Sequence, residues 1–151
     1  MCELIINGGN RLCGEVKIQG SKNASLPILA ATLLTDERCV IHNCPNISDT
    51  KTAFEILNDL GADVISLRDY VIVRAKKLCN DKIPQDLMGR MRSSVMFLGA
   101  TLARCGTAVI CNPGGCNLGE RPIDIHLRSL RRLGVRVCET NGCIFCSLGE
   151  K

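Results

Sequence analysis

The sequence GTAVIC NPGGCNLGERPIDIH occupies residues 106–126 and contains the features from which the rest of the chain is interpreted. Residues 106–111 predict a buried strand, and residues 123–133 carry apolar side chains at helical spacing. Between them lies a glycine-rich loop with one cysteine, Cys116, and an arginine, Arg121, directly before a proline. Glycines let backbone N–H groups approach a ligand closely, and a helix N-terminus attracts anions. The stretch therefore predicts a mobile lid that holds a thiol beside an anion-binding helix start. A structural turn with an incidental cysteine is the alternative.

The same order of predicted elements occurs twice in the chain. Three short stretches of the first half recur in the second half, two at an offset of 69 residues and one at an offset of 73. The pairs are ATLL and ATLA (31–34 and 100–103), VIHN and VICN (40–43 and 109–112), and LGAD and LGVR (60–63 and 133–136). The four extra residues fall in the Cys116 loop. We therefore expect two helix–strand–helix–strand–strand units, with an inserted functional loop in the second.

Apolar periodicity and turn residues outline the elements of these units. The predicted elements are strands at 4–6 and 14–18, a helix capped by Ser21 or Asn23 that runs to about residue 34, a strand at 38–42, a helix capped by Ser48 or Asp49 and ended by Gly61, a hairpin at 63–67 and 70–74, a polar connection at 76–86, and a helix that starts near 91–94. Lys22, Arg92 and Arg121 then stand at or near three helix starts. One such cation is most simply a solvated surface residue, but three in parallel positions favour an anionic ligand.

Composition narrows the class of protein. With 151 residues, 46% apolar and 23% charged, the chain is long enough for one globular domain. It has no apolar run long enough to span a membrane, and its start lacks a signal-peptide pattern, so a cytoplasmic location is expected. A net charge of +4 with one Tyr, three Phe and no Trp argues against nucleic-acid binding, which needs aromatic side chains for stacking.

The eleven cysteines are unusual for such a chain. Without a secretory signal they are expected to be reduced thiols rather than a disulfide framework. Cys39, Cys111 and Cys138 lie in strand-like runs and are expected to pack as small hydrophobic side chains. Cys143 and Cys146 have the spacing of a metal knuckle, but no second pair and no nearby histidine. Structural cysteines are therefore favoured there over a zinc site, which is the alternative.

Three motifs resemble one family of enzymes. SKNA at 21–24, MRSS at 91–94 and PGGCNLGERPIDIH at 113–126 are similar to the UDP-N-acetylglucosamine 1-carboxyvinyltransferase (enolpyruvyl transferase) family, over essentially the whole chain. The resemblance implies an α/β fold of the enolpyruvyl transferase type, an inside-out α/β prism of βαβαββ repeats with helices inward and sheets outward. It implies N-terminal strands at 1–19 that pack with another domain, repeat one at 20–86 and repeat two at 87–151. A third repeat and a second domain are absent from the 151 residues.

The resemblance also implies a reaction and a set of site residues. Enolpyruvate would pass from phosphoenolpyruvate to the 3-hydroxyl of UDP-N-acetylglucosamine, the first committed step of peptidoglycan synthesis, with no cofactor and no metal. Cys116 matches the catalytic cysteine. The residues that match phosphoenolpyruvate-binding positions are Lys22, Asn23 and Arg121; those that match sugar-nucleotide-binding positions are Arg92, Arg121, Pro122, Ile123, Asp124, Ile125 and His126.

Two further expectations follow from the absence of a third repeat and a second domain in these residues. The 151 residues are expected to be inactive alone, because the family's cleft has its other wall in the second domain. A non-catalytic module that binds uridine nucleotides, or a structural remnant without function, is the alternative. The repeat face that a third unit would cover is expected to support self-association.

Overall fold

The computed structural model describes residues 3–111 and 122–149. Its elements are α1 (Lys22–Ala31), η1 (Thr32–Leu34), β1 (Arg38–His42), α2 (Ser48–Asp59), β2 (Asp63–Ser66), β3 (Tyr70–Arg74), α3 (Gln85–Arg90), η2 (Arg92–Val95), α4 (Met96–Cys105), β4 (Thr107–Cys111), α5 (Asp124–Arg132), β5 (Val135–Thr140) and β6 (Cys143–Leu148). None of the helices among these residues is long and apolar enough to cross a membrane.

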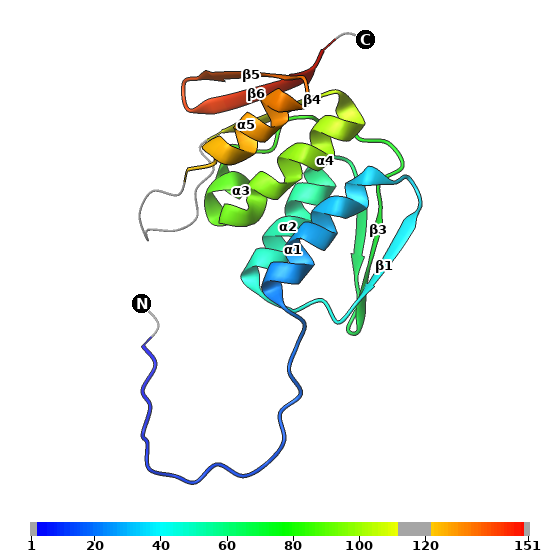
Figure 1. The fold of residues 1–151 in the computed structure, drawn as a ribbon. Helices are drawn as coiled ribbons and strands as arrows, with labels where there is room; N and C mark the ends of the chain where they lie inside the picture. The colour runs from blue at the N-terminus through cyan, green and yellow to red at the C-terminus, as the bar shows by residue number, and fades with distance from the viewer. Residues whose placement is uncertain (1–2, 112–121, 150–151) are drawn as a thin grey trace.

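The two units have the same topology. Each forms a three-stranded antiparallel sheet with its last strand in the middle, in the order β1-β3-β2 in the first unit and β4-β6-β5 in the second. The helices α1, α2 and α4 lie in the centre of the molecule, with one sheet on the right and the other at the top in Figure 1. This is the arrangement, helices inward and sheets outward, that the resemblance implied.

Alternation along the strands explains why the sheets face this way. Val71 and Val73 of β3 and Ala108 and Ile110 of β4 point toward the helices and are buried, whereas Phe145 of β6 points outward. The helices supply the rest of a continuous core. Its largest fully buried side chains are Leu26, Leu29, Leu33, Ile56, Leu57, Leu60, Ile83, Met88, Met91, Phe97, Leu98 and Ile110.

One side chain joins the two units through backbone carbonyls. Arg104, near the end of α4, donates hydrogen bonds to the carbonyl oxygens of Leu33 at 3.0 Å and Ala75 at 2.9 Å. Leu33 follows α1 and Ala75 follows β3. The Arg104 guanidinium therefore supplies hydrogen-bond donors to backbone carbonyls at the ends of these two elements of the first unit. Nothing in the sequence spacing singled out this arginine.

The predicted strands near the N-terminus are wrong. Residues 3–20 have no strand in the structure, and their apolar side chains, such as Leu4 and Leu12, are exposed. Figure 1 shows this segment running away from the helices. The alternating pattern is real, but a strand forms only when a neighbouring strand pairs with it, and no described part of the chain does so.

The start of α2 is also different from the prediction. The N-cap position is Ile47, not Ser48 or Asp49, and the capping contacts come from Thr50. The Thr50 hydroxyl accepts a hydrogen bond from the Ile47 N–H and donates to the Pro45 carbonyl at 2.7 Å. The other end agrees with the sequence: Gly61 has a φ of 100°, and a Cβ there would lie 2.7 Å from the Cys79 sulfur.

The connection after the first unit is more ordered than its polar composition predicted. Residues 81–83 run beside β4, where the Val109 N–H donates to the Asp81 carbonyl at 2.8 Å and the Ile83 N–H donates to the Val109 carbonyl. Helix α3 follows directly. The segment thus covers one edge of the second sheet, whereas no described strand or bridge pairs with the matching edge at β1.

Equivalent helices of the two units are buried to very different extents. Leu60, at the end of α2, is 0% exposed, but the equivalent Leu133 after α5 is 80% exposed. Thr52 of α2 is buried, whereas the equivalent Ile125 is 72% exposed. Helix α5 therefore presents apolar side chains at positions that the first unit covers with its neighbour.

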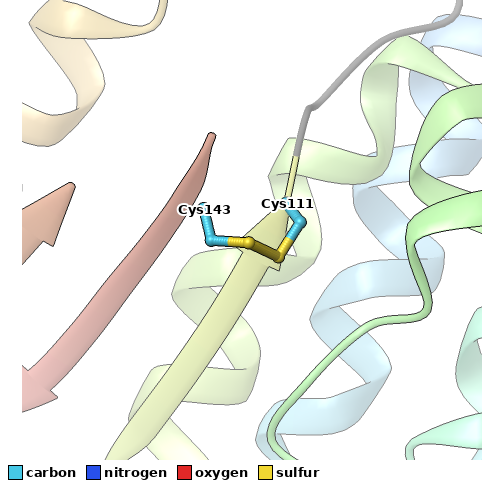
Figure 2. The surroundings of a disulfide bond; sticks show 2 residues. All are labelled: Cys111 and Cys143. Atoms are coloured by element: carbon cyan, nitrogen blue, oxygen red, sulfur yellow. A yellow bond between two sulfur atoms is a disulfide. The ribbon is translucent and has the colours of Figure 1, made fainter. Parts of the chain in front are cut away.

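The expectation that all cysteines are reduced thiols is wrong for one pair. Cys111, the last residue of β4, forms a disulfide with Cys143, the first residue of β6 (Figure 2). Two further expectations also change. Cys138 is exposed, although it was expected to pack as a small hydrophobic side chain. Cys143 and Cys146 do not act as a pair, because Cys143 forms the disulfide and Cys146 is a buried free thiol. The sequence placed Cys111 and Cys143 in strands but did not give the register that sets them opposite each other.

Candidate functional site

Lys22 begins α1, as predicted, and it already has an anionic partner. Its Nζ lies 2.8 Å from Oδ2 of Asp49, in the first turn of α2. The positive charge of Lys22 is unfavourable at a helix N-terminus, and the Asp49 carboxylate offsets it while also favouring the start of its own helix. Asn23 follows Lys22 on the same turn. An anionic ligand at this helix start would share Lys22 with Asp49 or displace it.

Arg92 is the first residue of η2, the turn that continues into α4. The predicted helix start near residues 91–94 is therefore confirmed, although the short helix α3 precedes it. The turn is fixed by Ser94, which is fully buried and whose hydroxyl donates to the Met88 carbonyl at 3.3 Å. Helix α4, into which η2 continues, packs directly against α1, so the turn that carries Arg92 leads into a helix that contacts the one carrying Lys22.

The segment predicted to bind the sugar nucleotide leads into α5. Pro122 and Ile123 precede the helix, and Asp124 is its first residue. The Asp124 carboxylate accepts a hydrogen bond from Arg128, one turn further on, at 3.4 Å. Ile125 and His126 are exposed. An aspartate at this position stabilises the helix start, so Asp124 has a structural role even without a ligand.

Cys116 and Arg121, the two most specific residues of the predicted site, lie outside the described residues. The structure does describe thiols that would compete with Cys116 for reagents. Burial raises the pKa of the Cys44, Cys105 and Cys146 thiols above the usual value for cysteine. A raised pKa lowers the thiolate fraction near neutral pH, so these three thiols are expected to react slowly.

The sequence did not predict the contacts made by Asp49 or by Cys111. Asp49 was considered only as a helix cap, and its ion pair with Lys22 joins residues 27 positions apart. Within residues 3–111 and 122–149, no group of three or more His, Cys, Asp or Glu side chains is arranged to hold a metal ion.

Two topologically identical α/β units with central helices and outer three-stranded sheets define the class of enolpyruvyl transferase folds. A solved structure of this class, the enolpyruvyl transferase NikO from Streptomyces tendae, matches with a TM-score of 0.82 and 27% sequence identity, over 95% of this chain and 32% of NikO. The family model described as EPSP synthase (3-phosphoshikimate 1-carboxyvinyltransferase) matches residues 6–149. The chain belongs to this family.

Relatives in sequence give a finer comparison. A protein of Caldanaerobacter subterraneus subsp. tengcongensis named UDP-N-acetylglucosamine 1-carboxyvinyltransferase 2 is 49% identical over 93% of this chain and 34% of its own length. A UDP-N-acetylglucosamine 1-carboxyvinyltransferase of Methylacidiphilum infernorum is 49% identical over 91% of this chain and 32% of its own length. The resemblance seen in the motifs is confirmed, and the chain spans about a third of the length of these relatives.

Proposed function

We propose that this chain carries substrate-binding residues and the catalytic cysteine of an enzyme that transfers enolpyruvate from phosphoenolpyruvate to the 3-hydroxyl of UDP-N-acetylglucosamine. This would be the first committed step of peptidoglycan synthesis. The observation that carries the proposal is 49% identity, over 93% of the chain, to a relative that bears this enzyme's name. Its support in the structure is that Lys22, Arg92 and Asp124 each begin a helix or a 3₁₀ turn.

The proposed roles are those that the resemblance implies, and the cationic residues fit the negative charges of the two substrates. Lys22 and Arg121 would hold the phosphate of phosphoenolpyruvate, with Asn23 between the two substrates. Arg92 and residues 122–126 would bind the sugar nucleotide. Cys116 would protonate the vinyl carbon while the sugar hydroxyl attacks the adjacent carbon, and neighbouring cations would lower the pKa of its thiol. The hydroxyl gives up its proton to a base as it attacks. The tetrahedral adduct would then lose phosphate together with one proton of its new methyl group, taken up by the Cys116 thiolate, which leaves the enolpyruvyl ether.

The proposed division of the chain follows the internal repeat. Residues 20–86 form the first repeat, residues 87–151 form the second with the Cys116 stretch, and residues 1–19 would pair with strands supplied from elsewhere. The exposed apolar side chains of residues 3–20 support this assignment, because such side chains usually mark an interaction surface.

The second candidate is a module that binds uridine nucleotides without catalysis. The observation in its favour is that the chain spans only 34% of the length of a relative that carries the enzyme's name. Both candidates bind UDP-N-acetylglucosamine. In the first, Cys116 takes part in a reaction beside the bound sugar nucleotide, and in the second it does not.

The test of the proposed site is a titration of the chain with UDP-N-acetylglucosamine. We expect saturable binding that weakens about tenfold in Arg92→Ala, because a charge-assisted contact to the nucleotide is lost. The matched control is Arg90→Ala: Arg90 is two residues away and pairs with Glu55 and Asp86 at the surface. Its loss should change the affinity less than about twofold. Equal affinities in Arg92→Ala and Arg90→Ala would remove Arg92 from the site.

Self-association is proposed through the exposed apolar side of α5. Removing a leucine contact from an interface costs about 1.5–3 kcal/mol, so Leu133→Glu should raise the dissociation constant of the oligomer at least about tenfold. Sedimentation velocity over a range of concentrations measures this. Leu67→Glu, the same substitution at an exposed residue in the turn between β2 and β3, serves as the control. A wild-type chain that stays monomeric at high concentration would exclude this interface.

A further inference from the structure

The Cys111–Cys143 disulfide occupies a defined place in the repeat. Cys111 and Cys143 are directly opposite each other in the β4–β6 ladder, with Cα atoms 4.0 Å apart. The equivalent positions of the first unit are His42 and Tyr70, which are opposite each other at the same end of the β1–β3 ladder. His42 and Tyr70 make only a tilted ring contact, with centroids 5.8 Å apart.

Comparison of the two sheets shows that the ladder forms with or without a covalent bond at this position. The first sheet has the same strand order and register as the second but no covalent bond at this position, so the sheet does not need one to form. The disulfide is therefore an additional connection, one that can be present or absent while the ladder persists. It is also selective, because Cys138 and Cys146 of the same sheet are free thiols.

We propose that Cys111 and Cys143 form a reversible thiol–disulfide exchange site whose reactants are low-molecular-weight thiols and disulfides. The two residues differ in their exposed fraction. Cys111 is 3% exposed, whereas Cys143 is half-buried, and the register places both side chains on the outer face with Phe145. We therefore infer that an incoming thiolate attacks the sulfur of Cys143, the more exposed residue of the pair. Figure 2 shows the bond between the end of β4 and the start of β6, at the rim of the sheet.

The exchange balances as an ordinary two-electron reaction. A small thiolate attacks Sγ of Cys143, the Cys111–Cys143 bond breaks, and Cys111 leaves as a thiolate that takes up a proton. A second small thiol then displaces Cys143 from the mixed disulfide. The protein gains two electrons and two protons, and one small disulfide is released. Oxidation is the reverse reaction, with a small disulfide as the oxidant.

The oxidation state should change the local stability of one sheet only. With the disulfide present, the end of β4 is fixed to the start of β6; without it, only ladder hydrogen bonds hold this end. Amide hydrogens near Cys111 and Cys143 should therefore exchange at least about tenfold faster in the reduced protein. Amides near His42 and Tyr70 should not change, which makes the first sheet an internal control. Neither this chemistry nor its test involves the substrates proposed above.

The experiment is differential alkylation of the unmodified, folded chain across a series of reduced and oxidised glutathione mixtures. Mass spectrometry measures how strongly each cysteine is labelled. We expect the labelling of Cys111 and Cys143 to fall together as the buffer becomes oxidising, with a tenfold change in their oxidised-to-reduced ratio for each ~30 mV. Labelling of Cys138 should change less than about twofold. Hydrogen exchange at the two ends of the series gives the second measurement.

Every other pattern would overturn the proposal. Such patterns are Cys111 and Cys143 changing independently, either one pairing with another cysteine, a bond that persists in the most reducing mixture, and thiols that never oxidise. Cys111→Ser/Cys143→Ser should exchange amides like the reduced wild type, and Cys138→Ser should keep the wild-type transition. The labelling of the wild type stands by itself if the double variant fails to fold.

Discussion

A preparation of the 151-residue chain alone is expected to release no measurable phosphate from phosphoenolpyruvate when UDP-N-acetylglucosamine is added. The chain corresponds to 34% of the length of a relative named for this activity, so most of that relative has no counterpart in these residues. Charge stabilisation of a transition state depends on donors placed around it, and the loss of one donor commonly costs ~10²–10³ in rate. A lid also excludes water only when it closes against a second surface. Several contributions would be missing together.

The assay is sugar-dependent phosphate release, with Cys116→Ser as the paired variant. Both chains should give the background rate obtained without the sugar nucleotide. Release by the wild type that depends on the sugar and disappears in Cys116→Ser would contradict this expectation. It would mean that a second copy of the chain supplies the other side of the site.

The largest expected effect on stability is that of Phe97→Ala. Phe97 begins the buried face of α4 and is 0% exposed, in a core shared by the helices of both units. Removing a buried aromatic ring loses its transfer free energy and leaves a cavity, which typically costs about 3–5 kcal/mol. We expect the free energy of unfolding to fall by that amount, a large part of the total for a domain of this size.

The chain provides a matched control in Phe145→Ala. Phe145 is 42% exposed on the outer face of the second sheet, so its truncation should cost less than about 1 kcal/mol. Urea denaturation followed by circular dichroism measures both variants. Similar losses in the two variants would show that the helices are not the centre of the core.

The sequence predicted the elements well where a local pattern was sufficient. Apart from α3, the strands and helices of both units follow from alternation, helical spacing and Gly61, and the internal repeat placed them in two equivalent units. Prediction failed at residues 3–20, because alternation reports that a segment can be a strand but not whether a partner is present. It also failed at the cap of α2, where Thr50 has the same hydrogen-bonding groups as Ser48 and competes for the same role.

The sequence predicted which residues belong to the candidate site but not the contacts that they make. The motifs named Lys22, Arg92 and residues 122–126, and the structure places them at the starts of elements. The Lys22–Asp49 ion pair and the Cys111–Cys143 disulfide were not predictable, because each joins positions 27 or 32 residues apart through packing or register. Local spacing carries no information on such contacts.

The most direct test of the proposed function is the rate at which Cys116 is alkylated, with and without UDP-N-acetylglucosamine. Limited alkylation near neutral pH is followed by mass mapping of all cysteines, and the epoxide fosfomycin serves as a second reagent. We expect Cys116 to react fastest of the free thiols, whereas Cys44, Cys105 and Cys146 react slowly and gain reactivity as the pH rises toward their raised pKa values.

The sugar nucleotide should slow the alkylation of Cys116 at least about tenfold, because the bound ligand would cover the thiol, and uridine alone should protect it less. Cys138, an exposed thiol remote in sequence from the proposed site residues, is the internal reference and should react at the same rate throughout. Protection of Cys116 by the sugar nucleotide but not of Cys138 is the result that the proposed function predicts. A Cys116 that reacts no faster than Cys138 and is not protected by UDP-N-acetylglucosamine would contradict it.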